Sequence, residues 1–164
     1  MIKCQYCTPE WLEETARIYG SDPNLEGKLR KLSAKMCFRI KAEPAWGIEK
    51  DIIFGTFIEA GKLVKIAFFS EEDAKREAEY LLAATPQEWK KVLRKENKFL
   101  TDFMLGRIKL EKGNKVTVLG LAPYAPTVID ALTKVQIQFP DEMSAEELTK
   151  YRAYMEEFRG SMAV

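Results

Sequence analysis

The first residues with a recognisable chemical pattern are Cys4 and Cys7, which form a C-x-x-C pair near the start of the chain. Thr8 and Pro9 follow as a helix start, and a helix N-terminus lowers the pKa of a nearby thiol. One interpretation is therefore a redox pair, or half of a metal site with Cys37 as a third thiolate. However, no strand precedes the pair as in a thioredoxin-like unit, and no second C-x-x-C or histidine completes a zinc tetrad. We favour cysteines that serve packing alone.

Other carriers of catalytic chemistry are few, because the 164 residues include no histidine. The absence removes His-dependent catalytic triads and zinc sites of the H-E-x-x-H type. Asp102 and Asp130 stand among apolar neighbours, where burial would raise a carboxyl pKa, but we expect both to face solvent. Tyr124 lies between two prolines and could donate a hydrogen bond to a ligand. No glycine-rich phosphate loop occurs. We expect a non-catalytic protein without cofactor or metal, an expectation that depends on the apolar pattern and the family resemblance described below.

The charge balance excludes further classes of function. The chain has 26 basic and 25 acidic residues, so as a whole it presents no basic field for nucleic acid or anionic membranes. The basic cluster from Lys90 to Lys95 is flanked by glutamates; we interpret it as a solvated helix face that could attract the phosphates of an acyl-CoA. No stretch approaches the roughly 20 apolar residues that span a bilayer, and the N-terminus lacks a secretory signal. We expect a cytoplasmic protein without nucleic acid or stable membrane insertion.

Hydrophobic periodicity, together with capping residues, predicts the elements that must position these groups. The expected helices span about residues 9–20, 23–32, 71–76, 86–97, 99–105, 127–134 and 144–160. The expected strands span about residues 35–43, 51–58, 63–69 and 107–112. Residues 80–84 fit either a helical face or a buried strand. In the strand at 35–43, alternation places Cys37 on the polar face.

The two strands at residues 51–58 and 63–69 flank a short glycine-containing connection, which predicts a β-hairpin. Apolar side chains occupy both faces of the first strand, with Phe54 on one face and Phe57 on the other. A sheet with one wet face does not need this pattern. The hairpin is therefore covered on both sides, or one side lines an apolar cavity. Because the run from 116 to 132 is also apolar, a compact core and a core with a cavity both fit the sequence.

Residues 78–114 resemble the sterol carrier protein (type two) lipid-binding domain, most closely in the piece FMLGRIKLEKGN at residues 103–114. The upstream helix and strands follow in the family's order, so the resemblance covers about residues 25–121. It implies an α+β fold with a mostly antiparallel five-stranded sheet, helices packed on one face, and an apolar tunnel for sterols, fatty acids or acyl-CoA. It also makes residues 80–84 a strand. The chain departs from the family's pattern at two prolines, Pro123 and Pro126, and at its extended termini.

The resemblance and the apolar surplus predict a single lipid-binding domain over residues 1–164, with an N-terminal helical extension at about 1–22 and a C-terminal helix at about 144–160. We expect intracellular binding and transfer of a sterol, fatty acid or fatty acyl-CoA, with the C-terminal helix as a lid or as a homodimer surface. The alternative is an accessory subunit or interaction module of a lipid or acyl-CoA metabolic enzyme; a C-x-x-C redox or metal protein is less favoured. Of the predicted ligand-binding residues, the family's tunnel wall matches Phe103, Met104, Ile108 and Leu110. The others are Phe54, Phe57, Trp89, Val118, Leu121, Tyr124, Met155 and Phe158.

Overall fold

The computed structural model describes residues 1–164 as an α+β fold built on a five-stranded sheet with the order β4-β3-β2-β5-β6. Strands β2 and β5 run parallel, and the other three neighbouring pairs are antiparallel, so the predicted fold class is confirmed. The strands of this sheet are β2 (Ala34–Ile40), β3 (Ile52–Glu59), β4 (Lys62–Phe69), β5 (Tyr80–Ala84) and β6 (Lys109–Lys112). A second, two-stranded parallel sheet pairs β1 (Lys3–Gln5) with β7 (Gln136–Gln138).

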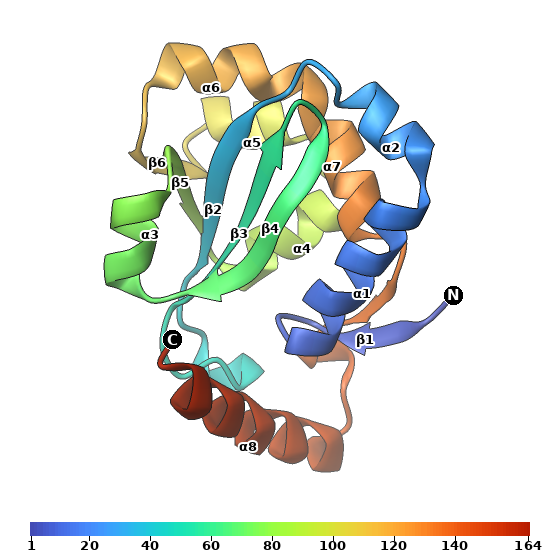
Figure 1. The fold of residues 1–164 in the computed structure, drawn as a ribbon. Helices are drawn as coiled ribbons and strands as arrows, with labels where there is room; N and C mark the ends of the chain where they lie inside the picture. The colour runs from blue at the N-terminus through green and yellow to red at the C-terminus, as the bar shows by residue number, and fades with distance from the viewer.

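The helices gather mainly on one side of the main sheet, where Figure 1 shows α4, α5, α6 and α7. The α-helices are α1 (Pro9–Ser21), α2 (Pro23–Lys28), α3 (Glu71–Glu77), α4 (Pro86–Leu93), α5 (Phe99–Met104), α6 (Lys115–Leu121), α7 (Ala125–Leu132) and α8 (Ala145–Met162). Three short 3₁₀ helices are η1 (Pro44–Trp46), η2 (Ala122–Tyr124) and η3 (Pro140–Glu142). No helix combines the length and the apolar character that crossing a membrane requires.

Local capping chemistry begins several of these helices where the sequence predicts. The Thr85 hydroxyl accepts from the backbone N–H of Glu88 at 3.1 Å, with Pro86 as the first residue of α4. At α8, Ser144 and Glu147 form the predicted reciprocal capping box. Helix α4 ends at Leu93, earlier than predicted, because the chain leaves helical geometry at Lys95, whose φ is +61°.

Both faces of the central hairpin are covered, as its two-sided apolar pattern predicts. Phe54 packs in the main core toward the helices, whereas Phe57 lies on the opposite face in a smaller cluster with Cys37 and Ala74 of α3. Because α3 covers this second face, Cys37 is fully buried. The expectation that Cys37 lies on a polar strand face is therefore wrong.

Helix α8 lies below the main sheet and contacts the N-terminal segment (Figure 1). Tyr151 of α8 donates a hydrogen bond to the backbone oxygen of Tyr6, and Arg159 donates to the backbone oxygens of Lys50 and Asp51. Helix α8 is thus held against the N-terminal segment and the loop before β3. The small β1–β7 sheet was not among the predicted elements.

Candidate functional site: an apolar cavity

An apolar cavity lies between the helix-covered face of the sheet and the helices α4, α6 and α7. Its volume is about 80 Å³, and all of its lining residues are hydrophobic. The lining residues are Tyr6, Leu32, Met36, Phe38, Phe54, Trp89, Val92, Leu93, Phe99, Val118, Leu121, Tyr124, Ala125, Val128, Ile129 and Leu132. We call this space the inner cavity.

The floor of the inner cavity follows from strand alternation and register. Met36 and Phe38 are two residues apart in β2 and therefore point to the same face of the sheet. Phe38 is paired in register with Phe54 of β3, and their ring centroids lie 5.1 Å apart. The ring of Trp89 meets Phe38 edge-on at 5.7 Å. The floor is thus a set of aromatic rings that present no hydrogen-bonding group to a ligand.

Helix α4 forms one wall because its apolar side chains fall on a single helical face. Trp89, Val92 and Leu93 are buried at the spacing of successive turns. The indole N–H of Trp89 also donates to the backbone oxygen of Arg39 at 2.9 Å. This bond ties the wall to β2 and satisfies a buried polar group beside an otherwise apolar space.

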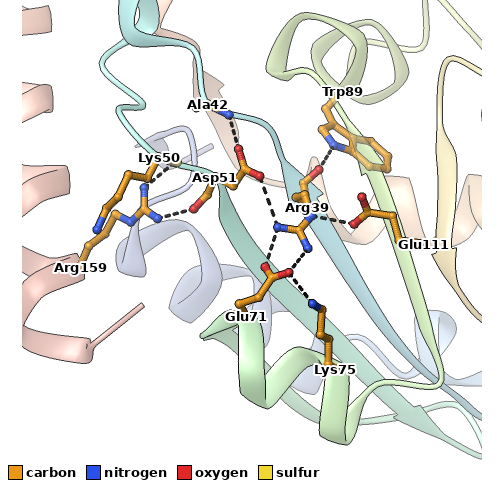
Figure 2. Close-up of polar contacts among 9 residues, drawn as sticks. All are labelled: Arg39, Ala42, Lys50, Asp51, Glu71, Lys75, Trp89, Glu111 and Arg159. Atoms are coloured by element: carbon orange, nitrogen blue, oxygen red, sulfur yellow. Dashed lines mark hydrogen bonds and ion pairs between the residues drawn. The ribbon is translucent and has the colours of Figure 1, made fainter.

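On the opposite face of the sheet, Arg39 is the centre of an ion-pair network (Figure 2). Its guanidinium donates two hydrogen bonds to Glu71, at 2.6 and 2.7 Å, and one to Glu111 at 2.7 Å. A longer contact of 3.3 Å reaches Asp51. Hydrogen bonding to Arg39 lowers the pKa of Glu71. Since the guanidinium is shared among carboxylates of α3, β6 and the loop before β3, the network joins these elements and is structural.

A second hollow, the outer groove, lies beside the inner cavity between the α4–α5 connection and the segment from α6 to α7. Its volume is about 580 Å³. Val92, Phe99, Ala125 and Ile129 line both spaces, and we call these four residues the shared wall.

Unlike the inner cavity, the outer groove carries polar groups. Lys95, Asn97, Lys98 and Asp130 contribute to its lining. Lys95 forms an ion pair of 2.6 Å with Asp130, which joins the α4–α5 connection to α7 across the groove. The shared wall therefore separates a wholly apolar space from a groove that carries both cationic and anionic side chains.

Asp102 of α5 organises the α4–α5 connection. Its side chain is fully buried and accepts from the Asn97 amide at 3.1 Å and from Arg107 at 3.1 Å. The expectation that Asp102 faces solvent is wrong, because these two partners replace the water that a carboxylate would otherwise need. Asp130 does reach solvent, as expected, with 41% of its side chain exposed beside Lys95.

The predicted ligand-binding residues divide between the inner cavity and other places in the fold. Those that line the cavity are Phe54, Trp89, Val118, Leu121 and Tyr124. Those that lie outside its lining are Phe57, Phe103, Met104, Ile108, Leu110, Met155 and Phe158.

The residues outside the lining are displaced for identifiable reasons. Phe57 is an odd number of positions from Phe54, so strand alternation sends it to the α3 side of the sheet. Met104 is 56% exposed on the outer side of α5. On α8, Phe158 packs against Phe68 of β4, with 5.3 Å between the ring centroids. No residue of α8 lines the inner cavity.

Sequence reasoning missed most of the residues that α4, β2 and α7 contribute to the lining. Met36 and Phe38 carried a usable signal, because they share the apolar face of the predicted strand at 35–43. Val128 and Ile129 lay inside the apolar run from 116 to 132. A position within that run gave no indication of which side chains face the sheet.

The cysteines show no sign of activation. All three are buried and unpaired, and desolvation raises the pKa of each thiol, that of Cys37 to about 12. The sequence predicted that the N-terminus of α1 would lower the pKa of the Cys4 and Cys7 thiols. Burial of the two thiols outweighs this effect. No group of three or more metal-binding side chains is present.

Two of the four residues of the basic cluster on and directly after α4 pair with acidic residues from the chain after β7. Lys90 pairs with Asp141 at 2.8 Å, and Arg94 pairs with Glu142 at 2.8 Å. The predicted solvated helix face is therefore in part a contact surface, which fastens α4 to η3.

No protein-family model matches the sequence, and no curated protein matches it significantly. The structure is similar to the solution structure of a conserved hypothetical protein from Thermus thermophilus, described as possibly a sterol carrier protein. The TM-score is 0.68 at 18% identity, covering 84% of this chain and 94% of that one. A crystal structure of sterol carrier protein 2 gives a TM-score of 0.63 at 19% identity, covering 78% and 95% of the two chains. The chain has the sterol carrier protein 2 fold, as the resemblance at residues 78–114 predicts.

Proposed function

We propose that this chain is a non-catalytic carrier that binds a lipid reversibly in the inner cavity and transfers it within the cytoplasm. The observation that carries the proposal is the lining, which is wholly hydrophobic and lies inside a fold shared with sterol carrier protein 2. A polar ligand would lose its hydrogen bonds to water in this space without replacement. The three unpaired cysteines fit a reducing compartment.

Among sterols, fatty acids and fatty acyl-CoA, the geometry favours a ligand with an acyl chain and an anionic head. The chain would lie in the inner cavity, and the head would lie in the outer groove near Lys98, which forms no ion pair within the fold, whereas Lys95 is paired with Asp130. A carboxylate or phosphate gains from this cation, whereas the single hydroxyl of a sterol does not need it.

The inner cavity must enlarge to hold such a chain. Its volume of about 80 Å³ is well below the ~300–1,000 Å³ of small-molecule sites, whereas the outer groove of about 580 Å³ falls within that range. Separating the side chains of the shared wall would join the two spaces. A continuous tunnel stays a prediction.

Burial of the acyl chain supplies enough free energy for a carrier. About ten methylenes at roughly 0.8 kcal/mol each give about 8 kcal/mol, which corresponds to a Kd of about 1 μM before the cost of opening the shared wall. Affinity should therefore rise with chain length until the enlarged space is full.

The test is displacement of a fluorescent fatty acid from delipidated protein, together with native mass spectrometry. We expect one ligand per chain, a Kd near the micromolar range, tighter binding of longer saturated acids, and a change in Trp89 emission. Lys98→Gln should weaken binding of a fatty acid but not of the corresponding alcohol, and Lys50→Gln, at an exposed lysine beside α8, is the matched control. Absence of any bound lipid at micromolar concentrations would refute the proposal.

A further inference from the structure

Four of the eight large hydrophobic side chains that the fold leaves exposed lie on or next to helices α5 and α6, and one of them, Leu100, lines the outer groove. Leu100, Met104 and Leu105 lie on α5 and at its end, with exposures of 47, 56 and 63%, and Val116 of α6 is 76% exposed. The other exposed large hydrophobic residues are near the chain ends, at Met1, Ile2 and Met162, or on the edge strand β4, at Val64. Helices α5 and α6 face each other across the groove, which Leu100 and Leu119 both line.

Helix α6 and the residues after it lack the charged outer face of an ordinary surface helix. No charged residue occurs from Val116 to Ile129. The inner side of α6 supplies Val118 and Leu121 to the inner cavity, while Val116 points to solvent. This stretch is apolar on both sides although one side is uncovered.

Basic residues outnumber acidic ones in the segment that carries this apolar face. Six basic and three acidic residues lie between Lys95 and Pro126, although the whole chain carries a net charge of only +1. Within the fold, Asp102 is paired with Arg107 and Glu111 with Arg39, and of the basic residues Lys95 is also paired, with Asp130. Lys98 and Lys115 are exposed and form no ion pair. The balanced total charge thus conceals a local positive field.

We propose that the α5–α6 face, meaning Leu100, Met104, Leu105 and Val116 with the cations Lys98 and Lys115, docks onto an anionic lipid bilayer. Exposed apolar side chains within a basic rim match the acyl boundary and the anionic headgroups of such a surface. The inference rests on the proposed function, because the docked face borders the groove that shares a wall with the inner cavity. Docking is peripheral and would bring the shared wall to the source of the lipid.

A bilayer fits this face better than a protein partner does, for a reason of geometry. The apolar residues stand on or next to two short helices beside the outer groove, whose volume of about 580 Å³ lies within the range of small-molecule sites. A protein that covered the face would also close this groove. A protein partner is therefore an outcome of the test below.

The experiment is flotation of the full chain with vesicles of phosphatidylcholine alone and of phosphatidylcholine and phosphatidylglycerol in equal parts. Each lysine near an anionic surface strengthens binding by about fivefold, so Lys98→Gln/Lys115→Gln should weaken binding to the anionic vesicles by about 25-fold. The matched control Lys3→Gln/Lys50→Gln, at an exposed lysine of β1 and an exposed lysine beside α8, should stay within about twofold of wild type. Added salt should release the wild-type protein.

Equal flotation of wild type and the Lys98/Lys115 variant would overturn the inference, as would no flotation of wild type. It would also be overturned if Val116→Asp converted a stable oligomer or hetero-complex into a monomer in size-exclusion chromatography, because a protein would then cover the face. Fatty-acid displacement without vesicles separates the two proposals. A chain that binds fatty acid but no vesicle refutes docking alone, whereas a chain that binds neither refutes the carrier proposal as well.

Discussion

Filling the shared wall should stabilise the protein and block its ligand at the same time. Ala125 lines both the inner cavity and the outer groove, and its φ of −55° and ψ of −44° are already helical although Pro126 follows. Ala125→Leu adds three carbon atoms at this position. Most damaging substitutions lower stability and binding together, so opposite signs would identify an effect of the cavity itself.

Two estimates give the size of the stabilisation. Three buried carbon groups at roughly 0.8 kcal/mol each contribute about 2.4 kcal/mol, and ordering a leucine side chain removes about 0.5–1 kcal/mol. Independently, eliminating all of the 80 Å³ at ~24 cal/mol per Å³ gives an upper bound of about 1.9 kcal/mol. We expect a gain of about 1.5 kcal/mol, which raises Tm by about 3–6 °C in a domain of this size.

The measurements are urea denaturation, differential scanning calorimetry and displacement of a fluorescent fatty acid. We expect binding at least tenfold weaker in Ala125→Leu, because the added side chain occupies the route between the two spaces. The control is Ala153→Leu on the exposed side of α8, which makes the same chemical change far from the cavity and should alter stability by less than about 0.5 kcal/mol. A less stable Ala125→Leu protein that binds fatty acid normally would refute the reasoning.

Three further predictions concern the groups around the site. Arg39→Met should cost about 2 kcal/mol in urea denaturation, because three carboxylates lose their shared cation. Arg39 lowers the pKa of Glu71. The stabilisation from this pair is therefore fully present above the ordinary pKa of a glutamate and is lost as the pH falls through the lowered pKa of Glu71. If the difference in unfolding free energy between wild type and Arg39→Met did not shrink in acid, the role given to Arg39 would be wrong. Asp102→Ala should lower the free energy of unfolding by about 2 kcal/mol, because Asn97 and Arg107 lose their hydrogen-bond acceptor. An unchanged urea denaturation curve would show that water replaces the lost carboxylate. All three thiols should resist Ellman's reagent in native protein and react in urea, since each is buried with a raised pKa; rapid native reaction would contradict this.

The elements that the sequence predicts well are those set by local chemistry. Thr85 with Pro86 and Ser144 with Glu147 begin helices through contacts within three residues, so no knowledge of the fold is needed. The strand at residues 80–84 was different, because local pattern allowed a helix and only the family resemblance decided for β5. The β1–β7 pair joins three-residue segments from opposite ends of the chain, a length at which periodicity carries no information.

The site was predicted less well than the fold, and for a physical reason. Sequence pattern indicates which side chains are apolar, but it does not distinguish a side chain that fills a core from one that borders empty space. Phe103 and Val118 are equally plausible on that criterion, yet only Val118 borders the inner cavity. Cys37 shows the same limit on the other face, where covering by α3 could not be inferred from the strand alone.

The hydrogen bond from Trp89 to the backbone of Arg39 makes the two sides of the cavity mechanically unequal. Helix α4 is tied to the sheet by this bond and to η3 by the ion pairs of Lys90 and Arg94. Helix α6 opposite has no side-chain hydrogen bond to another element beyond its own cap at Asn114. Expansion should therefore be one-sided, with α6 moving and α4 remaining in place. In hydrogen exchange, α6 amides should exchange faster than those of α4 in the empty protein, and bound lipid should slow α6 far more than α4.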